Sequence, residues 1–308
     1  MKIAIAGPGD LAKYQVEEFL KASLEVVVLS RREKEWFQQK EGVDFRIVDF
    51  TSVDSITENL RDCDGLVSCM LDMTMNSVTV HLNMIEAMLK TEKCKKFLPA
   101  EYGGDIMKYP DQPSFYYENH QPVREKLRSL PKGQLEYSLL AIGYLCDYFV
   151  PSKNRYIKDF DPFPLNLKEN TLIIPGTGDE RVSYTPTRDV AKAIASLFLT
   201  SEPWEDITWI SGETTTWNKI LAEDLTDLNL TVSTSTLTDS VKEMVDAHLA
   251  KDEDRIYAAA FKFWVLSDSL DLPEDLVAAH KKKYFSDIHF RTISEFRQAA
   301  KDFPESIV

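Results

Sequence analysis

The segment Lys2-Ile3-Ala4-Ile5-Ala6-Gly7-Pro8-Gly9-Asp10-Leu11-Ala12 decides the fold, because a short β-rich run leads directly into Gly-x-Gly-x-x-Ala. This is an accepted variant of the dinucleotide-binding fingerprint when a strand precedes it and a helix follows it. The glycines permit a tight turn and close backbone approach, and the start of the helix faces the pyrophosphate. Only 11 of 308 residues are glycine, so two within three positions carry weight against an ordinary glycine turn. The predicted nucleotide-binding residues here are Gly7, Pro8, Gly9, Asp10 and Leu11.

Beyond this segment, β-rich runs alternate with helical patterns through the first half of the chain. Strands are predicted at Ile3–Ala6, Glu25–Ser30, Phe45–Phe50, Gly65–Met70, Lys96–Pro99 and Tyr137–Ile142. Helices are predicted at Leu11–Ala22, Ser55–Leu60, Val78–Leu89 and Val123–Leu130. Strands separated by helix-length segments cannot form hairpins, so they predict a parallel sheet with helices on both faces. The fold class is therefore α/β, with a Rossmann-like, doubly wound parallel sheet.

The second half is less regular. Strands are predicted at Thr171–Ile174 and Thr208–Ile210, and helices at Arg188–Leu199 and Trp217–Leu225, with Thr187 and Thr216 as N-caps. From Val241 onward the pattern is mostly helical, and the aromatic group Tyr257, Phe261, Phe263 and Trp264 is interpreted as core. We expect a nucleotide-binding domain over residues 1–150. Residues 151–308 would form a smaller, mostly helical substrate lobe over the mouth of the sheet, with some strands joining it.

The composition excludes several classes of protein. The 36 basic and 50 acidic residues give a net charge of −14, which argues against binding to nucleic acid or to anionic membranes. No run is apolar enough for a membrane span or a signal peptide. The four cysteines have no metal-ligand spacing and predict reduced residues in a cytoplasmic protein. The histidines show no ligand spacing either, so no metal is predicted.

The second predicted strand ends at Ser30-Arg31-Arg32, about 20 residues past the glycines, where an NAD-preferring enzyme carries an acidic residue. Two arginines there can instead bind a 2′-phosphate, which predicts NADP(H) as the cofactor. The alternative is a solvated basic surface, since Lys34 follows closely.

In open α/β sheets, ligands bind beyond the carboxyl ends of the strands. After the third strand, Asp49 and Phe50 are predicted to contact adenine, or else to be turn residues. The ends of the fourth and fifth strands add the predicted cofactor-binding residues Ser68, Cys69, Met70, Pro99 and Ala100. The sixth strand leads to the predicted substrate-binding residues Tyr144, Tyr148 and Phe149.

Several motifs together resemble one family. They are the glycine turn, Arg31, Phe97-Leu98-Pro99-Ala100-Glu101-Tyr102-Gly103, Val123-Arg124-Glu125-Lys126-Leu127, Pro175-Gly176-Thr177-Gly178 and Tyr184-Thr185-Pro186-Thr187-Arg188-Asp189-Val190. Over most of its length the chain resembles the NmrA-like and isoflavone reductase-like branch of the atypical short-chain dehydrogenase/reductases, particularly fungal members. The resemblance implies this fold and NADP(H), and says little about the substrate. Two departures are a glycine loop one residue shorter, ending at Ala12, and Ala100 in place of the family's serine.

A third departure concerns catalysis. His120, four residues before Arg124, stands where the resemblance places the catalytic lysine. An imidazole titrates near neutrality and can act as acid or base. Tyr116, Tyr117 and Glu118 precede it, so a phenol or a carboxylate can orient it. The alternative is a surface histidine on a loop.

Glu101 and Tyr102 complete the predicted catalytic residues, which are His120, Tyr116, Tyr117, Glu101 and Tyr102. A carboxylate after a buried strand can have a raised pKa and serve as an acid or base, or it can cap the turn. Asp189 is interpreted as a helix-opening residue.

The resemblance implies an NADPH-dependent reductase of secondary metabolism. It would reduce a C=C, C=N or C=O bond in an aromatic or heterocyclic small molecule. The exchange at His120 leaves open a non-redox acid–base enzyme that retains NADP(H), such as an iminium-type cyclase or isomerase. A regulatory protein that senses NADP(H) is a third possibility, although dense aromatics near Tyr144 favour an enzyme with a substrate pocket. The protein is expected to be a monomer or a homodimer.

Overall fold

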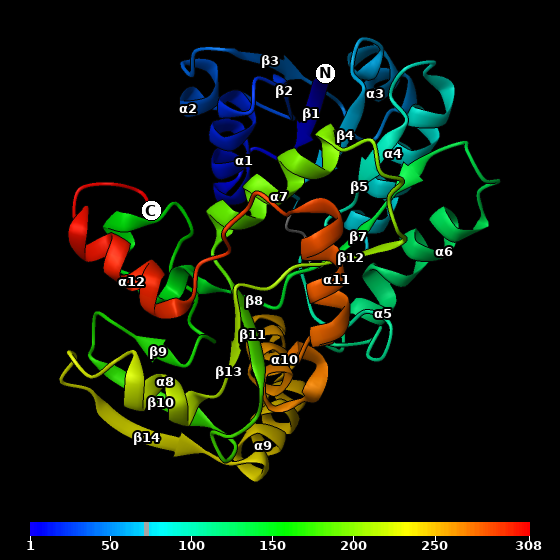
Figure 1. Ribbon diagram of the computed structural model, residues 1–308. Helices are drawn as coiled ribbons and strands as arrows, with labels where there is room; N and C mark the ends of the chain where they lie inside the picture. The colour runs from blue at the N-terminus through cyan, green and yellow to red at the C-terminus, as the bar shows by residue number, and fades with distance from the viewer. Residues whose placement is uncertain (71–73) are drawn as a thin grey trace.

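A six-stranded parallel sheet forms the centre of the computed structural model, which describes residues 1–70 and 74–308 (Figure 1). The strand order is β3-β2-β1-β4-β5-β6, so the order reverses beside β1. The strands are β1 (Lys2–Ala6), β2 (Glu25–Ser30), β3 (Val43–Ile47), β4 (Gly65–Ser68), β5 (Lys96–Leu98) and β6 (Glu136–Tyr137). The predicted doubly wound fold is confirmed, and the reversal gives the crevice in which ligands of such sheets bind.

Helices cover both faces of this sheet. They are α1 (Asp10–Lys21), α2 (Glu35–Gln38), α3 (Val53–Leu60), α4 (Asn76–Lys90), α5 (Tyr116–Asn119), α6 (Gln121–Ser129) and α7 (Thr187–Leu199). Alternate residues of β1 face opposite ways: Ile3 and Ile5 belong to the core under α1 and α7, and Ala4 and Ala6 to the core under α3 and α4. All four residues are completely buried, which is why Ile3–Ala6 is apolar at every position.

Two predicted strands differ from the structure. The third ends at Ile47, because Asp49 turns the chain by accepting hydrogen bonds from the backbone N–H and the hydroxyl of Thr51. The sixth is divided at Ser138 into β6 and β7 (Leu139–Ala141), and β7 pairs in parallel with β12 (Ile207–Trp209).

Of the two predicted N-caps, Thr216 is confirmed, since its side chain accepts from the N–H of Lys219. Thr187 is wrong as an N-cap. It lies inside α7, where its N–H and hydroxyl both donate to the buried carboxylate of Asp147.

The second half of the chain adds two three-stranded sheets and five further helices, several of which lie below the main sheet in Figure 1. The strands are β8 (Tyr144–Leu145), β9 (Leu165–Asn166), β10 (Thr171–Pro175), β11 (Val182–Thr185), β13 (Glu213–Thr215) and β14 (Thr231–Ser235). The helices are α8 (Trp217–Glu223), α9 (Leu237–Ala250), α10 (Glu253–Leu266), α11 (Glu274–Tyr284) and α12 (Ile293–Asp302). The division at residue 150 stays a prediction. None of the helices in residues 1–70 and 74–308 has the length and apolar character to cross a membrane.

Candidate active site

The glycine turn between β1 and α1 has two different requirements. Gly7 has φ +92°, and a β-carbon there would lie 2.9 Å from Cγ of Met70, so the protein itself demands glycine. Gly9 precedes the first residue of α1, and, its two chain neighbours aside, no atom of the described residues lies within 4 Å of the place where its β-carbon would be. Ala12 is fully buried and allows α1 to pack closely on the sheet. The protein therefore leaves open space at Gly9, directly before a helix N-terminus, where an anion can bind backbone N–H groups.

The turn after β2 presents Arg31 and Arg32 to solvent. The hydroxyl of Ser30 donates to the carbonyl of Arg32 and accepts from its N–H, which fixes the turn. Within the part of the chain that the structure describes, neither guanidinium is ion-paired to a carboxylate. Both groups are thus available for a phosphate, which a guanidinium can bind with two parallel hydrogen bonds.

The turn after β3 separates the two predicted adenine contacts. Asp49 is exposed, and hydrogen bonds from Thr51 lower the pKa of its carboxyl. The ring of Phe50 is only 2% exposed and belongs to the core with Ile56 and Met84, so it cannot lie along an adenine as expected. The structure therefore corrects the prediction for Phe50 and leaves Asp49 at this surface.

Tyr102 lies at the ends of β4 and β5 with a fully engaged hydroxyl. It donates to the carbonyl of Ser68 over 2.9 Å and accepts from Nε2 of Gln15 over 3.1 Å. The thiol of Cys69, also buried, donates to Oε1 of Gln15 over 3.0 Å. Burial raises the pKa of Tyr102 well above its ordinary value. Tyr102 and Cys69 thus join α1 to the strand ends, and either group would have to exchange a hydrogen bond to take part in proton transfer.

Glu101 is paired with Arg124 rather than held as a neutral acid. Arg124 donates to both carboxylate oxygens, over 2.9 and 2.7 Å, and also to the carbonyl of Pro110 over 2.6 Å. Burial opposes ionisation, but the hydrogen bonds and the charge of Arg124 outweigh it and lower the pKa of Glu101, and a proton on His120 would lower it further. The expectation of a raised pKa is therefore wrong. The pair joins the turn after β5 to α6 and fixes the backbone around Ala100.

His120 lies between α5 and α6, and its ring faces the end of β5. Its Nε2 lies 3.1 Å from the carbonyl of Ala100, and Nδ1 faces the side-chain oxygen of Asn119. The ring stacks on Tyr116, with centroids 3.8 Å apart and an interplanar angle of 18°. Burial is the largest influence and lowers the pKa of His120 to about 4, although Glu101 opposes this. The imidazole is therefore neutral at physiological pH, whereas a lysine would be a permanent cation.

The space beside His120 is small. A cavity of about 10 Å³ lies between α4, the end of β5 and the start of α6, which is room for about one water molecule. Its lining residues are Ser77, His81, Pro99, Ala100, Glu101, Asn119, His120 and Val123. The structure thus brings together the predicted residues Pro99, Ala100, Glu101 and His120. Tyr117 does not belong to this group, because its side chain is 61% exposed.

An aromatic wall continues from His120 into the second half of the chain. Tyr116 lies 6.2 Å from Trp264, Trp264 lies 5.8 Å from Tyr144, and Tyr144 lies 6.2 Å from Tyr148, all between ring centroids. Tyr144 and Tyr148 therefore lie near the predicted catalytic residues. Phe149 points instead into the lobe core, against Trp217 and Tyr184, and corrects the expectation of a substrate contact.

Trp264 joins this wall although its sequence pattern indicated only core. Its indole Nε1 and the hydroxyl of Tyr144 are buried and have no hydrogen-bond partner among the described residues. Such groups are uncommon in folded proteins, so each requires an explanation. An aromatic residue in a helical pattern gives no sign of an unpartnered donor, which depends on what surrounds it in space.

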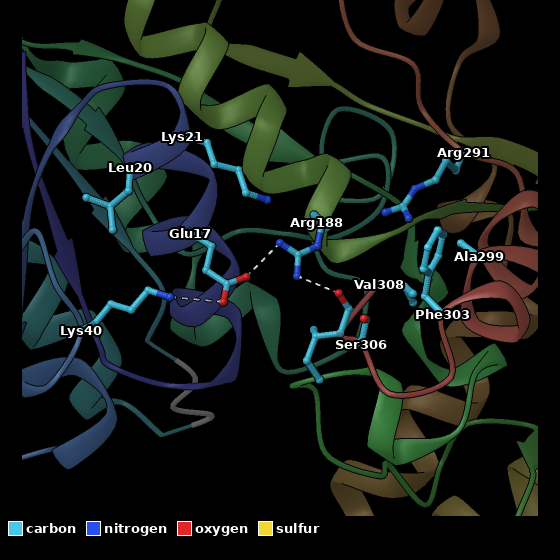
Figure 2. Close-up of a pocket in the computed structure, with 11 residues that line it drawn as sticks. Glu17, Leu20, Lys21, Lys40, Arg188, Arg291, Ala299, Phe303, Ser306 and Val308 are labelled. Carbon is cyan, nitrogen blue, oxygen red and sulfur yellow. Dashed lines mark hydrogen bonds and ion pairs between the residues drawn. The ribbon is translucent and has the colours of Figure 1, made fainter.

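A larger cavity lies elsewhere, between the C-terminal half of α1 and the C-terminal segment (Figure 2). Its volume is about 680 Å³. Leu20, in its wall, is 11 residues along α1 from Gly9, about 16 Å at the helical rise. The central cation, Arg188, donates to Glu17 over 2.9 Å, to Glu18 over 2.7 Å and to the carbonyl of Ile307 over 3.1 Å. The cavity contains none of the predicted site residues, and its central charge is already neutralised.

No family model matches the chain, but individual known proteins are similar to it. The chain is 42% identical over 317 residues to the oxidoreductase swnR of Arthroderma benhamiae, with 100% of both chains covered. It is 40% identical over 312 residues to the oxidoreductase swnR of Metarhizium robertsii, again with full coverage. The isoflavone reductase homolog A622 of Nicotiana glauca is 22% identical, with 61% of each chain covered.

Solved structures show the same fold. AtPrR2 with NADP⁺ and (+)pinoresinol has a TM-score of 0.74 and 18% identity, covering 97% of this chain and 98% of that one. An isoflavone reductase has a TM-score of 0.71 and 16% identity, covering 97% and 98%. At this identity the likeness concerns the fold. Together with the two full-length relatives, it shows that the chain belongs to the NmrA-like, isoflavone reductase-like family of oxidoreductases.

Proposed function

We propose that the protein is an NADP(H)-dependent reductase that acts on a polarised C=C, C=N or C=O bond in an aromatic or heterocyclic small molecule. The observation that carries the proposal is the space that the described residues leave open at Gly9 before α1. Two guanidinium groups at the end of the next strand add to it, since they form no ion pair within the described residues. Neighbouring structures solved with NADP⁺ or NADPH support it. A cytoplasmic location and a place in secondary metabolism are part of the proposal.

The nucleotide would be held along the carboxyl edge of the sheet. The backbone of Gly7–Leu11 and the N-terminus of α1 bind the pyrophosphate, and Arg31 and Arg32 bind the 2′-phosphate. Asp49 lies at the adenine end. The nicotinamide end is lined by the strand termini Ser68, Cys69, Met70, Pro99 and Ala100. NADPH, when bound, supplies the hydride.

His120 is the residue of this proposal that handles the proton. Because its ring is neutral at physiological pH, it acts as a hydrogen-bond donor or a base, not as a fixed positive charge. A proton on Nε2 would be donated to the carbonyl of Ala100, so proton transfer from this nitrogen requires that hydrogen bond to be exchanged for one to the substrate. Tyr116 stacks on the ring and holds its plane.

The substrate would lie against the aromatic wall of Tyr116, Trp264, Tyr144 and Tyr148. Tyr144 and Trp264 are 5% and 4% exposed and bring two unpartnered donors to this wall. A flat apolar molecule with an oxygen or nitrogen acceptor accepts a hydrogen bond from one of these donors. Its own ring contacts the wall in place of contacts that the aromatic side chains now make with one another. A lining of aromatic rings with few polar groups is typical of small-molecule sites.

Two measurements on the purified protein test the proposal. Nicotinamide fluorescence titrations are expected to show NADPH bound at least about tenfold more tightly than NADH, which is 1.4 kcal/mol. A panel of cyclic imines, enones and aromatic ketones is then offered with NADPH, and one cofactor is expected to be oxidised for each product molecule. Product formed without cofactor oxidation supports the acid–base enzyme instead. Tight NADPH binding without any turnover supports the sensor.

A further inference from the structure

Helix α9 exposes a line of large apolar side chains. Leu237, Val241, Val245 and Leu249 follow one another in steps of four residues, and they are 55%, 46%, 50% and 79% exposed. The opposite face of the helix, with Ser240 and Ala247, is buried where α9 packs against α10. We call these four exposed residues the α9 stripe.

The α9 stripe is unusual for this protein. Among the described residues, no other helix exposes more than one large hydrophobic side chain. Scattered exposed hydrophobics are normal, but a contiguous group marks a surface that another molecule covers. In Figure 1, α9 lies at the lower margin of the molecule, away from the main sheet and its ligand crevice. The stripe therefore needs an explanation other than the proposed nucleotide site.

The charges beside the stripe disfavour an anionic membrane as its partner. Asp239, Glu243 and Asp246 outnumber Lys242 along the helix, and the whole chain carries a net charge of −14. A membrane-bound helix instead carries lysines and arginines along its polar face.

We propose that the α9 stripe binds the same stripe of a second copy of this chain. A row of side chains in steps of four is the ridge that packs against an equivalent ridge at a crossing angle of about −50°. A two-fold axis at the level of Glu243 places Val241 against Val245 of the partner subunit. The same patch then serves both copies, as in an isologous interface.

Charge complementarity selects a second copy as the occupant. Lys242 and Asp246 lie one turn apart on the same flank of the stripe, are exposed, and form no ion pair within the described residues. Glu243, in contrast, is paired within the chain to Lys262 of α10 over 3.0 Å. In an antiparallel pair of helices, equal flanks face each other, so Lys242 comes within reach of Asp246 of the partner subunit, whose level along the helix differs by two residues, about 3 Å. The two-fold axis repeats this contact.

Sedimentation velocity of the full-length protein over a concentration series tests the proposal without cofactor or substrate. The unmodified protein is expected to form a dimer. Val245→Asp is expected to weaken association by about tenfold or more, because the two-fold axis places two carboxylates, one from each copy, in an apolar contact. Leu199→Asp is the matched control, since Leu199 is 54% exposed at the end of α7, and it is expected to leave association unchanged.

A charge exchange tests the register. Lys242→Asp and Asp246→Lys are each expected to weaken the dimer about fivefold, and the double exchange to restore it. Each of three results would overturn the proposal. They are a monomer at every concentration, equal dissociation of the dimer by Leu199→Asp and Val245→Asp, and no restoration of the dimer by the double exchange. Circular dichroism checks folding, and Leu249→Gln, at the most exposed position, replaces Val245→Asp if that variant does not fold. NADPH titration of each variant separates this result from the proposed function.

Discussion

Glu101 and Arg124 form a bidentate ion pair whose side chains are 2% and 1% exposed. The pair fixes the turn that carries Ala100, the acceptor of the His120 hydrogen bond. Arg124→Met is expected to lower the free energy of unfolding by about 3–5 kcal/mol, because it leaves a carboxylate buried without a counter-charge. The double variant Glu101→Gln/Arg124→Met is expected to lose less, since it buries no charge. Urea unfolding measures both, and equal losses in the two variants would contradict the ion-pair explanation.

The two glycines of the first turn predict opposite outcomes for one substitution. Gly7→Ala is expected to cost about 1–3 kcal/mol of stability, because φ is positive there and the β-carbon meets Met70. Gly9→Ala is expected to change stability by less than about 0.5 kcal/mol, since its β-carbon enters open space. It should nevertheless weaken NADPH binding about tenfold or more by filling the place of the pyrophosphate. Thermal unfolding and NADPH titration separate the two effects, and unchanged NADPH affinity in Gly9→Ala would remove the main support for the nucleotide site.

Arg31→Ala is expected to reduce the affinity for NADPH about tenfold while leaving that for NADH nearly unchanged, because only NADPH carries the 2′-phosphate. Fluorescence titration with both nucleotides measures the preference. Lys34→Ala is the control for general surface charge. The proposal fails here if Arg31→Ala weakens both nucleotides equally.

Two buried tyrosines test whether the hydroxyl of Tyr144 serves a ligand. Tyr14 donates to Asp147 and accepts from the N–H of Tyr156, each over 2.9 Å, so Tyr14→Phe is expected to cost about 1–3 kcal/mol. Tyr144→Phe removes a hydroxyl without a partner, so stability is expected to stay constant or rise by about 1 kcal/mol. Urea unfolding of the ligand-free protein measures both, and a loss in Tyr144→Phe as large as that in Tyr14→Phe would show that the hydroxyl is structural.

His120 predicts a specific dependence of stability on pH. Its pKa falls from 6.5 to about 4 on folding, so the unfolded chain binds the proton more readily. The contribution of the neutral ring is complete above pH 6.5 and is lost as the pH falls toward 4, by about 3 kcal/mol. The stability difference between the natural protein and His120→Gln, measured from pH 8 to 4, should follow this curve. A difference that does not change with pH would show that His120 titrates normally.

Local patterns predicted the sheet because its central strands β1, β2 and β4 are mostly buried and are bounded by turns. The glycine turn was predicted because its strand, turn and helix are contiguous in the sequence. The break at Ser138 was not visible, because beyond it the chain pairs with β12, and the hydroxyl of Thr208 that lies 2.7 Å from that of Ser138 is 70 residues along the chain.

The candidate site was predictable in position and less so in chemistry. The ends of the strands identified the residues around the crevice. The pairing of Glu101 with Arg124 and the burial of the Phe50 ring depend on packing between distant segments, so neither followed from the local pattern. Trp264 is separated by 144 residues from His120, and only the folded chain brings it to the same wall.

The packing of α7 on α1 determines when the core can be completed during synthesis on the ribosome. Val190, Ile194 and Phe198 of α7, followed by Phe285 and Phe290, complete the core beside β1 and α1. Synthesis proceeds from the N-terminus, so the half that carries the nucleotide fingerprint leaves the exit tunnel before these residues exist. Until they arrive, the face of the nascent sheet under α1 lacks the part of its cover that α7 supplies, so apolar surface stays exposed and prone to aggregate. Chaperones that bind apolar segments should associate with the chain during that interval.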